Sequence, residues 1–190
     1  MNPTPIDLHR NIIGLTTEHE VRIPLRTLVK FAIEGIIAEF GVFEGASLRG
    51  IQAATKRTVY GFDSFKGLQE YWNDAHPVGR FACPVPDCSP AIIVEGFFQD
   101  TLDKFIDEHP IPWAFAHMDA DLYSSTIYVL DRVGPRMPIG AFLVFDEFKN
   151  EPGCEHEQRA FTEYVEKSKQ VWEHIADGRD NRVAVFRRIK

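Results

Sequence analysis

The sequence predicts an α/β fold with one doubly wound sheet, mostly parallel, that ends in an antiparallel hairpin. Short apolar runs alternate with amphipathic segments along the chain, which is typical of βαβ units around a parallel sheet. The 190 residues, 44% hydrophobic and 26% charged, are enough for one domain with a buried core. No repeat, low-complexity tract or Gly/Ser linker divides the sequence. We therefore predict a single domain over residues 1–190.

Five apolar runs have the length and the β-branched or aromatic content of strands that are buried on both faces. These predicted strands are Ile36–Val42, Thr58–Asp63, Ala91–Phe97, Trp113–Asp119 and Ala141–Glu147. Two further runs, near residues 171–176 and 182–189, flank the turn-forming segment Asp177–Asn181. This pattern predicts that the chain finishes as an antiparallel hairpin.

Helices are predicted where apolar residues recur at helical spacing after the third, fourth and fifth strands. These stripes are Leu102, Phe105 and Ile106, then Leu122, Thr126, Val129, Leu130 and Val133, and last Phe161, Tyr164, Val165 and Ser168. Residues 1–34 are predicted to form a helical cap, with a helix from about Thr17 to Glu34, on a core of residues 35–190. Residues Gln69–Pro90 form a long insertion rich in proline and aromatic residues. Loops of this length in compact domains usually have a function.

Charge and composition exclude several classes of partner. The formal charge of −7, from 21 Lys+Arg and 28 Asp+Glu, opposes binding to the phosphates of a nucleic acid. No stretch approaches the ~18 consecutive apolar residues of a membrane span. The N-terminal residues lack the basic and apolar regions of a secretory signal, and three cysteines suit reduced thiols. We expect a cytoplasmic protein that acts on a small molecule, with neither nucleic acid nor membrane as partner.

A glycine-containing turn, Glu39–Ser47, follows the first predicted strand. Gly41 and Gly45 let the backbone turn sharply and let a ligand approach, and the next helix offers its N-terminal amides. Asp63 ends the second strand about 20 residues further on, where nucleotide-binding α/β folds place an acid on the ribose hydroxyls. A plain strand–helix turn and a helix cap at Asp63 are the structural alternatives. We interpret the two features together as a nucleotide site.

Acidic residues follow the fourth and fifth strands. Asp119 and Asp121 end the fourth, in His117-Met118-Asp119-Ala120-Asp121, and Asp146-Glu147 end the fifth. The carboxyl ends of neighbouring parallel strands meet at one edge, where crowded carboxylates repel one another unless a cation lies between them. Oxygen ligands without paired Cys or His favour Mg²⁺ over zinc. For Asp121 alone, a cap on the next helix is the favoured interpretation.

Other candidate residues carry weaker signals. His117 lies in an apolar strand, where a hydrogen-bonded core histidine is the default and a catalytic base is the second hypothesis. Cys83 and Cys88 lack the C-x₂-C spacing of zinc sites. The Phe97-Phe98 pair either walls a flat ring or belongs to the core.

Five segments together resemble one known family in order and spacing. They are residues 41–49, 59–68, 95–102, 117–126 and 144–148. The chain, from about Gly35 to its C-terminus, resembles the macrocin O-methyltransferase family. Its members are class I S-adenosylmethionine-dependent enzymes with a Rossmann-like sheet, and those studied methylate sugar hydroxyls of macrolide and aminocoumarin antibiotics. Many members carry Asp-Asp where this chain has Asp146-Glu147, and this chain is short before the first strand.

The resemblance implies a role for each segment. The Gly41–Ser47 turn would hold the methionine part of the cofactor, Asp63 the ribose, and the segment 98–101 the adenine. The cofactor-binding set that it predicts is Glu39, Gly41, Phe43, Glu44, Gly45, Ser47, Asp63, Ser64, Phe98, Gln99, Asp100 and Asp119. Asp119, Asp146 and Glu147 fall where the family binds Mg²⁺.

The leading functional hypothesis is therefore an S-adenosylmethionine- and Mg²⁺-dependent O-methyltransferase that acts on a hydroxyl of a small molecule, such as a sugar or a secondary metabolite. Asp119 is the predicted general base and His117 the reserve. Because Asp119-Ala120-Asp121 resembles the Asp-x-Asp motif of haloacid dehalogenase-type enzymes, a phosphoester hydrolase using Asp119 is the second hypothesis. A nucleotide-binding protein without turnover is the third. A homodimer formed through the N-terminal helix is a further hypothesis.

Overall fold

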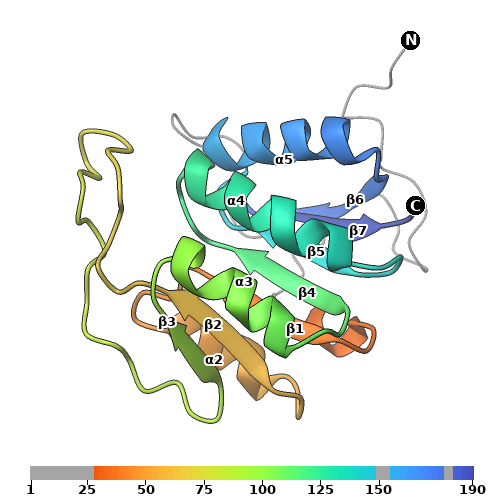
Figure 1. Ribbon diagram of the computed structural model, residues 1–190, viewed down its shortest axis with the longest axis horizontal. Coiled ribbons are helices and arrows are strands. Elements are labelled where there is room, and N and C mark those ends of the chain that lie inside the picture. The colour runs from red at the N-terminus through yellow and green to blue at the C-terminus, as the bar shows by residue number, and fades with distance from the viewer. Residues whose placement is uncertain (1–27, 149–154, 178–181) are drawn as a thin grey trace.

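The computed structural model describes residues 28–148, 155–177 and 182–190 and contains a seven-stranded sheet in the order β3-β2-β1-β4-β5-β7-β6 (Figure 1). The strands are β1 (Ile36–Phe40), β2 (Val59–Asp63), β3 (Ile92–Glu95), β4 (Trp113–Met118), β5 (Phe142–Phe145), β6 (Trp172–Asp177) and β7 (Ala184–Arg188). The first five are parallel, and β7 runs antiparallel to both of its neighbours, β5 and β6. The predicted fold class is confirmed, with each strand at its predicted place. Most of the predicted hairpin turn, residues 178–181, lies outside the described residues.

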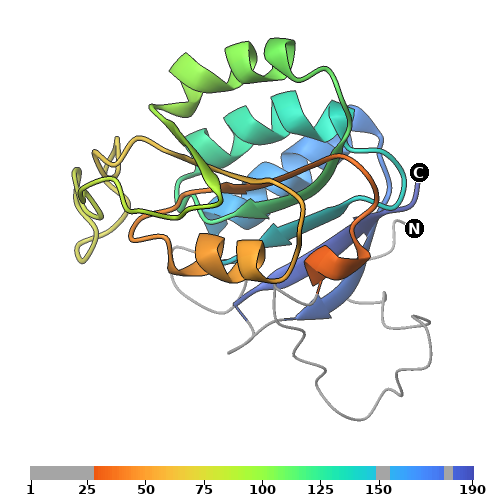
Figure 2. The same cartoon turned by 90° about the horizontal axis from the view of Figure 1, so that it is seen from below.

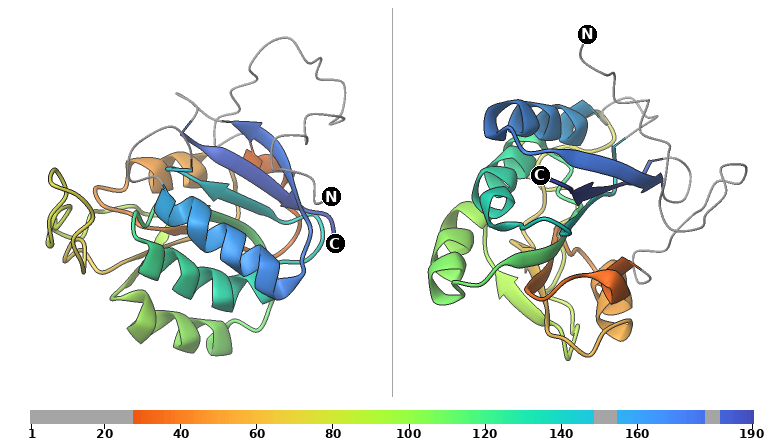
Figure 3. Two further views of the ribbon diagram at one scale, coloured as in Figure 1. Left: turned by 90° about the horizontal axis from the view of Figure 1, so that it is seen from above. Right: turned by 90° about the vertical axis from the view of Figure 1, so that its right-hand side faces the viewer.

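Helices cover both faces of the sheet (Figure 2). They are α2 (Ala46–Ala53), α3 (Phe98–Glu108), α4 (Tyr123–Val133) and α5 (Glu155–Ser168), with the short 3₁₀ helices η1 (Val29–Phe31) and η2 (Gly134–Arg136). The helices α3, α4 and α5 lie side by side on one face, whereas α2 and η1 lie on the other (Figures 2 and 3). No helix of the described ranges is both long and apolar enough to cross a membrane.

The central strands are buried because both of their faces carry apolar side chains. In β1, Ile36, Ala38 and Phe40 belong to the apolar cluster under α3, α4 and α5. Ile37, between them, belongs to the second cluster, with Leu48 of α2. This alternation follows from the period of two in a strand, and it explains why the sequence shows continuous apolar runs rather than alternating ones.

The N-terminal helix ends earlier than the sequence predicts. It was expected to reach Glu34, but its described part ends at Phe31, and Ala32 is extended. The guanidinium of Arg57 donates hydrogen bonds to the carbonyl oxygens of Ala32, Ile33 and Gly35. These carbonyls therefore bind a side chain instead of later amides of a helix. Residues 17–27 of the predicted helix lie outside the described residues.

The strand order places a crevice between β1 and β4. The chain moves outward from β1 through β2 to β3, and then returns to β4 on the other side of β1. Ligands of doubly wound folds bind at such a reversal, at the carboxyl ends of the strands. Residues 64–91, which include the predicted insertion Gln69–Pro90, connect β2 to β3 without a helix and project from this same edge (Figures 1 and 3).

Candidate functional site

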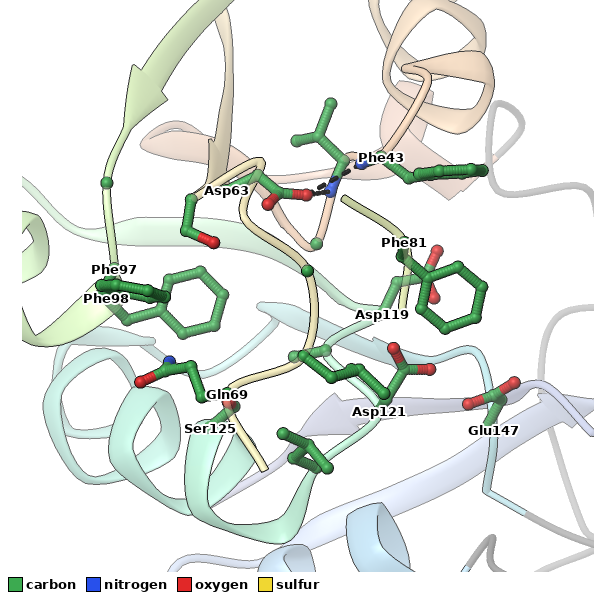
Figure 4. Close-up of a pocket in the computed structure, with 18 residues that line it drawn as sticks. Phe43, Asp63, Gln69, Phe81, Phe97, Phe98, Asp119, Asp121, Ser125 and Glu147 are labelled. Atoms are coloured by element: carbon green, nitrogen blue, oxygen red, sulfur yellow. Dashed lines mark hydrogen bonds between the residues drawn. The ribbon is translucent and has the colours of Figure 1, made fainter. Parts of the chain in front are cut away.

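A cavity of about 240 Å³ opens at the carboxyl ends of β1, β2 and β4 (Figure 4). It is lined by Gly41, Val42, Phe43, Asp63, Ser64, Gly67, Leu68, Gln69, Phe81, Gly96, Phe97, Phe98, Asp119, Ala120, Asp121, Leu122, Ser125 and Glu147. Asp119, Asp121 and Glu147 form one end, hereafter the acidic end, beside Phe81. Phe97 and Phe98 form the opposite, aromatic end (Figure 4).

The turn after β1 requires glycine at its start. Gly41 has φ of 91°, and a Cβ atom there would lie 1.8 Å from the carbonyl oxygen of Asp119. Only glycine therefore lets this turn approach the end of β4 so closely. Gly45, with φ of 78°, precedes α2 as its N-cap. Phe43, between the two, has φ of 48° and lines the cavity.

Asp63 holds this turn in place. Its Oδ2 accepts hydrogen bonds from the backbone amides of Val42 at 2.7 Å and Phe43 at 2.8 Å (Figure 4). Its Oδ1 accepts one from the amide of Phe65 at 2.8 Å. A carboxylate offers about four acceptor positions, so one remains for a hydroxyl of a ligand. The sequence predicted a ligand contact for Asp63 but missed its function as the support of the glycine turn.

The predicted cofactor residues divide into two groups. Those that line the cavity are Gly41, Phe43, Asp63, Ser64, Phe98 and Asp119. Those that do not are Glu39, Glu44, Gly45, Ser47, Gln99 and Asp100. Glu44, Gln99 and Asp100 are exposed because they lie where the chain enters α2 and α3 and turns away from the cavity. Glu39 is buried against His117.

Several lining residues were not singled out from the sequence. Leu68, Leu122 and Ser125 lie in segments that resemble the family, but none was predicted as a site residue. Gln69 and Phe81 come from the insertion that loop length had already marked as functional. Phe81 meets Phe43 edge-on, with ring centroids 5.6 Å apart. Both residues have positive φ, which is uncommon outside glycine and is often found at functional sites.

The acidic end has perturbed protonation. Burial raises the pKa of Asp119 well above its ordinary value, and the charge of Asp146 raises it further. Burial also raises the pKa of Asp121 to about 9, together with the charge of Glu147 and a hydrogen bond to it. The interpretation of Asp121 as a helix cap is wrong, because Leu122 occupies the N-cap of α4 and no side chain caps there. Asp121 instead takes φ of 59° and joins Glu147 in the cavity.

Asp146, unlike the other two predicted metal ligands, does not line the cavity. Its Oδ1 is 3.7 Å from Nε2 of His117. Burial pushes the pKa of Asp146 upward, but His117 and then Arg182 outweigh this and bring the pKa below its ordinary value. Burial likewise opposes the charged form of His117, yet Asp146, Glu39 and Asp119 together raise its pKa well above 6.5.

His117 is buried behind the cavity rather than exposed in it. Its side chain is 1% exposed, and Nδ1 lies 2.8 Å from Oε1 of Glu39. One donor atom from each of Glu39, His117 and Asp119 lies within 4.8 Å of the other two. Closely spaced buried carboxylates with raised pKa values fit a divalent cation, which would compensate their mutual repulsion.

The fold is that of class I methyltransferases. The structure superposes on the calicheamicin methyltransferase CalS11 with a TM-score of 0.68 and 26% identity, covering 85% of this chain and 74% of that one. It matches the O-methyltransferase NovP with the same score and identity, covering 87% and 78% of the two chains.

Residues 90–188, just over half of the chain, match the macrocin-O-methyltransferase family, and the chain belongs to that family. A relative in Streptomyces olivaceus, 8-demethyl-8-(2,3-dimethoxy-alpha-L-rhamnosyl)-tetracenomycin-C 4'-O-methyltransferase, is 26% identical over 72% of this chain. Demethyldecarbamoylnovobiocin O-methyltransferase of Streptomyces niveus is 26% identical over 93% of it. The chain spans 62% of the length of the first relative and 75% of the second. The glycine turn and Asp63 precede the segment that matches the family.

Proposed function

We propose that this protein is an S-adenosylmethionine-dependent O-methyltransferase that methylates a hydroxyl of a small molecule such as a sugar or a secondary metabolite. The observation that carries this proposal is one cavity at the β1–β4 crevice that joins the turn held by Asp63 to an acidic end. The names of its family and relatives, all O-methyltransferases, support the reaction class.

The two ends of the cavity suggest how the cofactor would lie. The free acceptor position of Asp63, with Ser64 beside it, would receive the ribose hydroxyls. The adenine would lie toward Phe97 and Phe98, where aromatic rings offer flat apolar contact. The methionine part would follow the glycine turn toward the acidic end.

In the proposed reaction, a bond would form between the acceptor oxygen and the methyl carbon while the bond from carbon to sulfur would break, and the hydroxyl proton would pass to a base. Asp119 is the proposed base because its carboxyl group lines the acidic end, and its raised pKa makes the ionised carboxylate a stronger base. His117, which is buried behind the cavity, is the second candidate for the base. Holding the two reactants together can supply ~7–11 kcal/mol of the barrier, and Phe43, Phe81 and Gln69, which line the cavity, would help to hold them.

The proposal includes a divalent cation, which the sequence predicts to be Mg²⁺. Asp119, Asp146 and Glu147 would hold it, and their crowding with Asp121 supports this. A bound cation lowers the pKa of a hydroxyl and orients its oxygen. Glu157 of α5 supports the arrangement, because its Oε2 accepts the backbone amide of Glu147 at 3.1 Å.

The segment 69–90 is the proposed wall of the acceptor site. Gln69 and Phe81 line the cavity, and Glu70 accepts a hydrogen bond from the hydroxyl of Ser124 in the first turn of α4. The Glu70–Ser124 hydrogen bond and the Phe43–Phe81 pair both hold the segment over the cavity. A small-molecule partner and a cytoplasmic location stay predictions. The N-terminal helix, through which a homodimer was predicted to form, lies mostly outside the described residues.

Calorimetry with S-adenosylhomocysteine and a methyl-transfer assay test the proposal. We expect binding in the micromolar range typical of enzyme substrates, and transfer of the methyl group to a member of a panel of glycosides and hydroxylated metabolites. Hydrolysis of a generic phosphoester without cofactor binding would favour the hydrolase instead. Binding without transfer to any member of the panel would favour a nucleotide-binding protein without turnover.

A further inference from the structure

The prediction of Mg²⁺ rests on a donor set of oxygen atoms alone, but the structure adds a buried nitrogen to that set. His117 is 1% exposed and Glu39 is fully buried. Within the part of the chain that the structure describes, Nε2 of His117 and Oε2 of Glu39 have no hydrogen-bond partner. Buried polar atoms are nearly always paired, so an unpaired imidazole nitrogen beside carboxylates points to a ligand.

The spacing around Nε2 fits a shared cation better than a hydrogen bond. The 3.7 Å between Nε2 of His117 and Oδ1 of Asp146 is too long for a hydrogen bond. Two ligand atoms, each about 2.1 Å from one metal ion, lie about 3.0–3.6 Å apart at angles of 90–120°. A shift of about a tenth of an ångström would bring the pair into that range. Nearby, an oxygen of Asp119 lies within 4.8 Å of a donor atom of His117 and of one of Glu39.

Glu39 completes an arrangement that is common at metal sites. Histidine ligands usually donate their second ring N–H to a carboxylate, which fixes the ring and leaves the other nitrogen for the metal. Here Nδ1 of His117 lies 2.8 Å from Oε1 of Glu39. Glu39 and His117 are register partners in β1 and β4, and His117 is the register partner of Val144 in β5, two residues before Asp146. Three adjacent strands therefore bring this group together.

We propose that Nε2 of His117, oriented by Glu39, is a metal ligand together with Asp119 and Asp146, so that the site selects a first-row transition cation such as Mn²⁺ over Mg²⁺. The inference rests on the proposed function only in placing a cation at the ends of β4 and β5. Imidazole suits transition metals, whereas Mg²⁺ prefers oxygen ligands and keeps much of its water.

The test uses the full chain, freed of metal with a chelator, and titrates Mn²⁺ alone and Mg²⁺ alone by calorimetry. Pulsed EPR of the Mn²⁺-loaded protein then detects nitrogen nuclei bound to the metal. We expect Mn²⁺ to bind at least tenfold more tightly than Mg²⁺, with coupling to an imidazole nitrogen. In His117→Gln the coupling should vanish and the preference should fall severalfold. In Glu39→Gln the coupling should remain while the affinity for Mn²⁺ falls about tenfold.

The matched control is His174→Gln. His174 is also buried and its Nε2 also faces a carboxylate, that of Asp177 at 2.8 Å, but it lies in β6 away from the cavity. This variant should keep both the affinity and the coupling. Bound Mn²⁺ without nitrogen coupling in the wild type would overturn the inference, as would a failure to bind Mn²⁺, and neither result depends on the folding of a variant. Binding of S-adenosylhomocysteine to the same protein tests the proposed function independently of the identity of the metal.

Discussion

Replacing Asp63 by alanine should weaken both the fold and cofactor binding. The carboxylate accepts three backbone amides, and two of them belong to the buried residues Val42 and Phe65. A buried donor that loses its partner costs ≈ 1–3 kcal/mol. Water can replace the acceptor at the exposed Phe43, so the loss from the other two is about 2–6 kcal/mol. At about 2–4 °C per kcal/mol for a protein of this size, the melting temperature should fall by roughly 4–24 °C.

The same substitution removes the acceptor proposed for the ribose hydroxyls. A hydrogen bond to a charged group contributes about 1.5–3 kcal/mol, so the affinity for S-adenosylhomocysteine should fall roughly tenfold to a hundredfold or more. Thermal unfolding and calorimetry measure the two effects. The control is Asp87→Ala, since the Asp87 carboxylate only caps an exposed turn through the amide of Ser89. Unchanged stability and unchanged affinity in Asp63→Ala would refute the assignment of Asp63 as support and as ligand contact.

Three further predictions follow from the cavity. Chelation should abolish methyl transfer while cofactor binding largely survives, and a divalent cation should restore the transfer. The variant Asp146→Ala should likewise bind the cofactor without transferring the methyl group. Full activity in excess EDTA would indicate metal-independent base catalysis. Hydrogen exchange in residues 69–90 should slow when cofactor and acceptor bind, and equal protection in all states would contradict the proposed wall. Gly41→Ala should destabilise the protein strongly, because its Cβ would lie 1.8 Å from the carbonyl oxygen of Asp119; a normal melting temperature would show that the turn can move.

The strands could be predicted because burial on both faces leaves a direct mark on the sequence. Runs such as Trp113–Met118 and Phe142–Phe145 are apolar at almost every position, and they became fully buried central strands. The position of Asp63 could also be predicted, since the chain length between the glycine turn and the end of the next strand is set by one strand–helix–strand unit. The end of the N-terminal helix could not, because it depends on Arg57, more than twenty residues away.

The contacts of His117 with Glu39 and Asp146 could not be predicted from the sequence for a different reason. Whether His117 faces Glu39 depends on the register between β1 and β4, and Asp146 meets the same ring only through the register of β5. A shift of one residue would turn each side chain to the other face. The sequence placed the acids at one edge of the sheet but did not show which of them share the cavity. The structure puts Asp119, Asp121 and Glu147 there and leaves Asp146 with His117.

The raised pKa values at the acidic end predict in which direction the stability of the protein changes with pH. Asp121 has a pKa of about 9 in the folded protein, chiefly through burial and then the charge of Glu147, against 3.8 as its ordinary value. Between these pH values the folded protein holds a proton that the unfolded chain releases, so the free energy of unfolding falls as pH rises. The raised pKa values of Asp119, His117 and Glu157 act in the same direction.

In EDTA, the melting temperature should therefore decrease between pH 6 and pH 9. It should decrease less in Asp121→Asn, which cannot ionise and which tolerates the φ of 59° at this position. The control Asp87→Asn, on the exposed loop, should follow the wild type. A divalent cation should also flatten the wild-type profile, because it stabilises the ionised carboxylates that repel one another without it. A melting temperature that rises over this range in EDTA, or a slope shared equally by Asp121→Asn and the wild type, would mean that Asp121 and Glu147 do not share a proton in the folded protein.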